Sequence, residues 1–107
     1  MKIALGCDHG GFELKEDLKI FLKELGYEVV DYGTHSTEIV DYPDIVFPLA
    51  KDVAEGKFER GIICCGTGVG VSIAANKVRG IRAANCHDTF SARASREHNN
   101  TNILTLG

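Results

Sequence analysis

The sequence has 107 residues, of which 44% are hydrophobic and 25% charged, and its formal net charge is −3. This length and composition are typical of one globular domain with a single core. The acidic balance, without any lysine or arginine cluster, argues against nucleic acid or an anionic membrane as the main partner. No apolar run is long enough to span a bilayer and no signal-peptide pattern precedes the first strand, so we expect a cytoplasmic protein.

The first part of the chain predicts a strand, a helix and a second strand. Residues 2–7 form a short apolar strand, and residues 28–31 form the second. Between them, apolar residues repeat at helical spacing up to a stop at Gly26. The predicted apolar stripe of this helix consists of Leu14, Leu18, Phe21, Leu22 and Leu25. Such a crossover is almost always right-handed and joins parallel strands.

The remainder repeats this alternation. A polar loop over 33–42 leads to Pro43, which fits the first turn of a helix that ends at Gly56. A third strand begins at Gly61 and its helix runs to about Lys77. A fourth strand is predicted over 80–86, then a helix through Glu97 with Asp88 as its N-cap, and a fifth strand over 102–107.

Alternating strands and helices predict an α/β fold. We expect a doubly wound, Rossmann-like three-layer αβα sandwich with a five-stranded parallel sheet, formed as one domain by residues 1–107. Ligands of such folds bind beyond the carboxyl ends of the strands. A closing helix would normally cover the fifth strand, so we expect the chain to be part of a longer protein that supplies a C-terminal helical segment.

The glycine-rich stretch after the third strand carries the clearest functional signal. It contains Cys65, Gly66, Thr67, Gly68, Val69 and Gly70. Because glycine lacks a Cβ, the N–H groups of this loop can point into one concavity, and the following helix adds partial positive charge. These donors favour the thiolate of Cys65, which becomes a candidate nucleophile or base.

Neither named glycine motif fits this loop. A P-loop requires lysine at the position of Thr67, and a dinucleotide fingerprint requires different glycine spacing after the first strand. Anion binding and a merely tight strand-to-helix turn both remain open from the loop alone.

Other polar residues follow the predicted strands at the same edge of the sheet. They are Asp8 and His9 after strand one, Asp41 and Tyr42 after the long loop, and Cys86 and His87 after strand four. We expect these groups to line one crevice with Cys65 and Thr67; the alternative role for Asp8 is helix capping. His35 is expected to be a surface loop residue.

His98 and Asn99 are expected at the opposite edge of the sheet. They end the fourth helix, which runs antiparallel to the strands. If they take part in a site, they should serve the crevice of a second subunit, because their own crevice lies at the other end of the strands.

The four cysteines, Cys7, Cys64, Cys65 and Cys86, fall within or at the ends of apolar strands. We therefore expect reduced thiols rather than disulfides. The alternative is a metal site that combines cysteines with His9 or His87. No Cys-x-x-Cys or His-x-x-x-His pair supports it, so no metal site is predicted.

Five segments together resemble the sugar-phosphate isomerase family that contains ribose-5-phosphate isomerase B and the galactose-6-phosphate isomerase subunits. The resemblance covers essentially the whole chain. The segments are Gly6-Cys7-Asp8-His9-Gly10-Gly11-Phe12, Asp41-Tyr42-Pro43, Cys65-Gly66-Thr67-Gly68-Val69-Gly70, Asn76-Lys77-Val78-Arg79-Gly80-Ile81-Arg82-Ala83 and Glu97-His98-Asn99-Asn100-Thr101-Asn102.

The resemblance implies interconversion of ribose 5-phosphate and ribulose 5-phosphate through a cis-enediolate, without metal or organic cofactor. It implies that Cys65 is the base, with Thr67 hydrogen-bonded near the thiol, and that His98 opens the furanose ring. The N–H groups of residues 66–70 would stabilise the enediolate oxygen. Asp8, Tyr42 and Asn99 would hold hydroxyls, and His9 would contact the phosphate.

The resemblance also implies a homodimer with sites shared between subunits, with tetramers possible by further pairing. In the family, arginines after the fifth strand bind the phosphate, and these 107 residues end before that segment. The alternatives are an isomerase of allose or galactose 6-phosphate, a non-catalytic phosphosugar-binding subunit, and a thiol redox or metal-binding protein built on Cys64 and Cys65.

Overall fold

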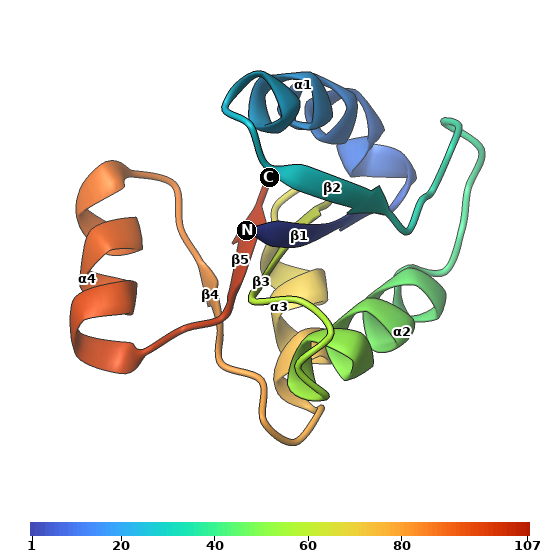
Figure 1. The fold of residues 1–107 in the computed structure, drawn as a ribbon. Coiled ribbons are helices and arrows are strands. Elements are labelled where there is room, and N and C mark those ends of the chain that lie inside the picture. Colours follow the sequence, from blue (N-terminus) through green and yellow to red (C-terminus); the bar gives the residue numbers. More distant parts are fainter.

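The computed structural model describes residues 1–107 and confirms the predicted fold. Five parallel strands form one sheet in the order β2-β1-β3-β5-β4, with helices on both faces (Figure 1). The elements are β1 (Lys2–Cys7), η1 (His9–Gly11), α1 (Phe12–Glu24), β2 (Glu28–Asp31), α2 (Tyr42–Ala54), β3 (Arg60–Cys64), α3 (Val69–Asn76), β4 (Ala83–Asn85), α4 (Thr89–Asn99) and β5 (Ile103–Leu106). Strand β2 lies on one side of β1 and β3 on the other, so the order of the strands reverses at β1, and ligand sites of doubly wound folds lie at such a reversal.

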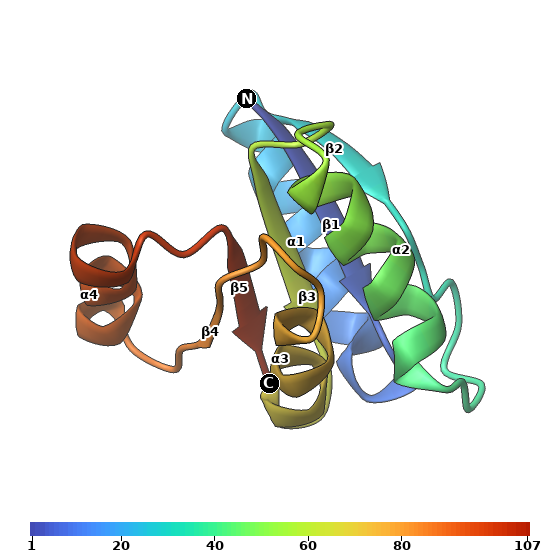
Figure 2. The same ribbon diagram turned by 90° about the horizontal axis from the view of Figure 1, so that it is seen from below.

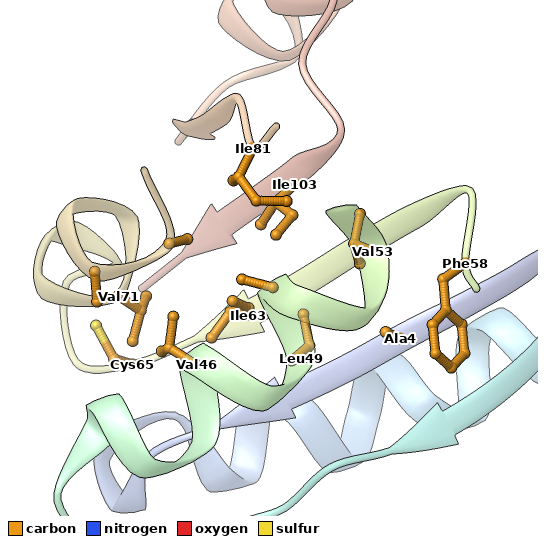
Figure 3. Close-up of a cluster of buried hydrophobic side chains, with 13 residues drawn as sticks. Ala4, Val46, Leu49, Val53, Phe58, Ile63, Cys65, Val71, Ile81 and Ile103 are labelled. Carbon is orange, nitrogen blue, oxygen red and sulfur yellow. The ribbon is translucent and has the colours of Figure 1, made fainter. Parts of the chain in front are cut away.

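The main core lies between the sheet and helices α2 and α3 (Figure 3). Successive side chains of a strand point to opposite faces, so Ile63 and Cys65 enter this core while Cys64 points to the other face. Val46 and Leu49 of α2 and Val71 of α3 pack against them. The buried residues of α2, which are Val46, Leu49, Ala50 and Val53, recur at helical spacing on this face.

Helix α1 differs from its prediction. It covers the other face of the sheet, where Leu22 packs against Ile3 and Leu5, but Phe21 and Leu25 are exposed. A lysine is buried instead: the side chain of Lys15 is fully enclosed, and its Nζ lies 2.8 Å from Asp31 Oδ2. The hydrophobic pattern predicted an apolar contact and did not anticipate this ion pair beneath the helix.

Few side chains cover the edge of the sheet that β4 and β5 form. Strand β4 is shorter than predicted, and no residue of α4 is buried. Helix α4 stands apart from the other helices in both ribbon views (Figures 1 and 2). The predicted N-cap is confirmed, since Asp88 Oδ1 accepts the N–H of Ser91 at 2.6 Å. A cavity of about 700 Å³ lies between α4, α1 and β5, lined in part by Leu14, Leu104 and Leu106.

None of the helices is both long enough and apolar enough to cross a lipid bilayer.

Candidate active site

Cys65 follows β3 directly and faces the start of α3. Its side chain is 7% exposed, and its Sγ accepts the backbone N–H of Gly68 at 2.9 Å. Gly68 adopts φ +79°, a left-handed conformation that glycine tolerates, and it is the N-cap residue of α3. The turn thus aims an amide donor at the sulfur, and a hydrogen bond of this kind stabilises negative charge there.

Some N–H groups of the loop are paired within the chain and others are not. Gly68 donates to Cys65, and Val69 donates to Thr67 Oγ1 at 3.1 Å. The N–H groups of Gly66, Thr67 and Gly70 have no acceptor within the chain. These three groups belong to the loop and first turn of α3 (Val69–Asn76) and are unpaired within the chain, so they can donate to an anionic oxygen.

Asp8 caps the short helix η1. Its Oδ1 accepts the N–H groups of Gly10 and Gly11 at 2.9 and 3.1 Å, so the capping role predicted as the alternative is present. Oδ2 makes no hydrogen bond within the chain and is free for a ligand. A Cβ on Gly10 would lie 3.2 Å from the Gly66 nitrogen and 3.4 Å from Asp8 Oδ1, so η1 and the glycine loop are in close contact.

His9 belongs to η1, which follows β1, and Tyr42 begins α2 after the loop that follows β2. His9 Nδ1 accepts the N–H of Val40 at 3.3 Å, which leaves Nε2 to carry the proton of the neutral ring. The ring of Tyr42 packs over Gly70, where an added Cβ would lie 3.3 Å from Cζ. The structure therefore brings Asp8, His9 and Tyr42 together around the Cys65 loop.

His87 and Cys86 lie on the other side of the loop. They line the cavity beside α4 together with Gly66 and Thr67, as predicted for groups that follow parallel strands at one edge of the sheet. Asp8 and His9 do not line that cavity, so the cavity beside α4 does not by itself join all the groups expected in one crevice. The glycine loop separates the groups of β1 from those of β4. His35 is exposed, as predicted.

His98 and Asn99 are remote from this loop. They are exposed at the C-terminal end of α4, where the carbonyl of Asn99 accepts Nε of Arg82 at 2.6 Å, just before β4 begins. The predicted placement at the amino edge of the sheet is confirmed. Within a single chain these two residues cannot meet Cys65.

The four cysteines are free and buried. Burial raises the pKa of Cys7 to about 11 and that of Cys64 to about 12, so both remain protonated thiols at neutral pH. They differ from Cys65, whose sulfur has an amide donor. No group of three or more histidine, cysteine or acidic side chains is arranged to hold a metal ion.

The prediction missed Asn85, which contacts the glycine loop, and Thr105, which contacts Asn85. Asn85 Nδ2 donates to the carbonyl of Thr67 at 3.3 Å, and Thr105 Oγ1 donates to Asn85 Oδ1 at the same distance. The sequence does show a polar residue near the end of each of these short apolar strands. The two residues meet only because β4 and β5 are neighbours in the sheet, with Asn85 paired to Thr105.

Comparisons with known proteins agree with this geometry. The sequence profile of a family described as Ribose/Galactose Isomerase matches residues 3–107. Ribose-5-phosphate isomerase B of Escherichia coli is 54% identical over 106 residues, which cover 99% of this chain and 71% of that protein. D-erythrulose-4-phosphate isomerase of Pectobacterium atrosepticum is 45% identical over 108 residues, covering 100% of this chain and 71% of the relative.

A solved structure gives the same result. Ribose-5-phosphate isomerase B of Clostridium thermocellum superposes with a TM-score of 0.98 at 59% sequence identity, covering 100% of this chain and 72% of its own.

Proposed function

The chain belongs to the ribose/galactose isomerase family, and from this premise we propose that it interconverts ribose 5-phosphate and ribulose 5-phosphate with Cys65 as the base. Membership makes it a sugar phosphate isomerase of the ribose-5-phosphate isomerase B type. The observation that supports the catalytic assignment is the hydrogen bond from Gly68 N–H to Cys65 Sγ. This contact directs a backbone donor at the sulfur from the same loop that carries the unpaired N–H groups of Gly66, Thr67 and Gly70.

The proposed reaction moves one proton between neighbouring carbons. The Cys65 thiolate takes the proton from C2 of the open-chain aldose and an S–H bond forms. The electron pair of the broken C2–H bond forms the C1=C2 double bond, and the π pair of the C1 carbonyl moves onto O1 to give the enediolate. The thiol then returns the proton to C1, and the O2 proton passes to O1 as the C2 carbonyl forms. The N–H groups of Gly66, Thr67 and Gly70 would stabilise the enediolate charge, usually the largest contribution to such catalysis.

The remaining roles follow the family's pattern. Thr67 is proposed to hydrogen-bond near the thiol, and the free Oδ2 of Asp8 and the hydroxyl of Tyr42 would hold substrate hydroxyls. His9 would donate Nε2–H to the phosphate. No metal or organic cofactor is proposed, so EDTA should leave the turnover unchanged.

We propose that the site is completed by a second copy of the chain. His98, which would open the furanose ring, and Asn99, which would hold a hydroxyl, are exposed at the far end of α4, away from Cys65. A homodimer can bring that end to the partner's glycine loop by two-fold symmetry. Pairing of such dimers into tetramers is compatible with this arrangement.

The first test compares Cys65→Ala with Cys86→Ala in the complete natural protein that contains these residues. Cys86 is a matched control because it is also buried and directly follows a strand. Ribose 5-phosphate turnover should fall by at least about 10²-fold in Cys65→Ala, the lower range for loss of a general base, and persist in Cys86→Ala. Comparable turnover in both variants would refute the assignment.

The shared site has its own test. Cys65→Ala and His98→Ala should each be inactive, but mixed and reassociated subunits should recover about a quarter of the wild-type activity, because half of the dimers carry one intact site of two. No recovery, despite exchange of subunits, would contradict a site shared between copies.

The substrate is tested against a specific alternative. Because a relative is named for D-erythrulose 4-phosphate, kcat/KM should be compared for four-, five- and six-carbon sugar phosphates, including allose and galactose 6-phosphate. We expect ribose 5-phosphate to give the highest value. Binding without turnover of any of them would indicate a non-catalytic phosphosugar-binding subunit.

A further inference from the structure

A single peptide group joins the catalytic sulfur to a side chain on another strand. The carbonyl of Thr67 and the N–H of Gly68 belong to one planar trans peptide and point in opposite directions. The N–H donates to Cys65 Sγ at 2.9 Å, and the carbonyl accepts Asn85 Nδ2 at 3.3 Å. Rotation of this peptide would therefore break both contacts together.

The orientation of Asn85 is itself determined by the sheet. Asn85 is the last residue of β4 and pairs in register with Thr105 of β5, so both side chains lie on the same face. Thr105 is fully buried, and its hydroxyl donates to Asn85 Oδ1 at 3.3 Å. With Oδ1 occupied by this donor, Nδ2 is directed to the carbonyl of Thr67.

The packing leaves little room for another arrangement. A Cβ added to Gly68 would lie 2.2 Å from Asn85 Oδ1, so the amide rests directly against the Gly68 Cα. Gly68 at φ +79° thus meets two requirements: it adopts the left-handed turn, and it leaves space for Asn85.

We propose that Asn85, oriented by Thr105, is a positioning residue for Cys65. It holds the 67–68 peptide so that the Gly68 N–H remains on the sulfur and stabilises the thiolate. Asn85 acts through this peptide and not on the substrate. The inference deepens the proposed function and rests on it, because only a catalytic role for Cys65 gives the thiolate a use.

The thiolate's ultraviolet absorbance tests this directly, because it needs neither substrate nor reagent access. Each protein is titrated with pH against its own Cys65→Ala counterpart, so the signals of other cysteines and tyrosines cancel. Asn85→Ala and Thr105→Val should each raise the midpoint by about half to one pH unit, a three- to tenfold lower thiolate-to-thiol ratio at a given pH. Thr105→Ser, which keeps the hydroxyl, should restore the wild-type midpoint.

A matched control separates positioning from general damage to β4. Asn76 also bridges to this strand, donating Nδ2 to the Ala83 carbonyl at 3.0 Å and accepting the Ala83 N–H at 2.8 Å, but it does not contact the 67–68 peptide. Asn76→Ala should leave the midpoint unchanged. The titratable neighbours of the loop, which are Cys64, Asp8, Tyr42, Cys86 and His87, are the same in all variants.

Two results would overturn the proposal. One is an unchanged midpoint in Asn85→Ala and Thr105→Val with native circular dichroism; the other is an equal shift in Asn76→Ala. Failure of the proposed function is distinguishable, because a wild-type protein without isomerase activity still yields a midpoint for each variant.

Discussion

Replacing Lys15 by methionine should destabilise the protein far more than the same change at a neighbouring lysine. Lys15 is the one charged residue that is buried. Its Nζ lies 2.8 Å from Asp31 Oδ2 and 2.8 Å from Glu16 Oε2, and its side chain is 0% exposed. The network also supports the site, because Asp31 Oδ1 accepts the N–H of Gly33 at the start of the loop that reaches His9.

The loss of stability in Lys15→Met depends on the contacts that Asp31 keeps after the substitution. Removing one partner of a buried ion pair costs about 3–5 kcal/mol, because the other charge is left uncompensated. Asp31 would keep Lys19 at 3.0 Å and the Gly33 N–H at 2.8 Å, and methionine retains most of the aliphatic stem. We therefore expect Lys15→Met to lower the free energy of unfolding by about 2–3 kcal/mol.

Urea denaturation measures this loss, and Lys19→Met is the matched control. Lys19 lies 2.9 Å from Glu16 and 3.0 Å from Asp31, the same two carboxylates, but its side chain is 25% exposed. Its loss should cost about 1 kcal/mol or less. If both substitutions cost the same within error, the buried position of Lys15 does not strengthen the network and the reasoning is refuted.

Three further predictions follow from the same packing. Gly68→Ala should lower the free energy of unfolding by at least about 1–2 kcal/mol, because alanine disfavours the left-handed conformation, and it should reduce isomerase turnover, because the added Cβ displaces Asn85. Thermal unfolding measures the first effect and steady-state kinetics the second, and an unchanged melting temperature would contradict the prediction. Cys7 and Cys64, with pKa values raised by burial to about 11 and about 12, should resist iodoacetamide at neutral pH and react only in urea, as read by peptide mass spectrometry; rapid labelling of the native protein would show that they are accessible. Burial raises the pKa of Asp31, but hydrogen bonds from lysines and the loop amide outweigh this and leave it below its usual value. Its contribution to stability should therefore be complete above about pH 4 and fade as pH falls further, so the urea-measured difference between wild type and Lys15→Met should shrink there; a difference that is constant with pH would contradict this assignment.

The elements of the fold could be predicted because their signals are local. Strands β1 and β2 lie where predicted, and glycines and Pro43 mark the helix ends. The prediction failed where burial depends on distant neighbours. Lys15 is buried because Asp31, on the next strand, offers a carboxylate beneath α1, and helical periodicity treats a lysine as a solvent-facing residue.

The same distinction holds for the site. The contact between Cys65 and its loop spans three residues, so glycine spacing predicted it. The contact of Asn85 with Thr67 spans 18 residues and exists only because β5 lies between β3 and β4. Strand order is a property of the whole sheet, and the alternation of elements along the sequence does not specify it.

Deuterium transfer tests the central claim most directly. Ribose 5-phosphate is incubated in deuterium oxide with the complete natural protein, and NMR measures deuterium at C1 of the ribulose 5-phosphate formed. The proposed proton transfer through Cys65 predicts deuterium at C1 in the wild type and in Cys86→Ala, and none above background in Cys65→Ala. Full exchange in Cys65→Ala would show that another group is the base.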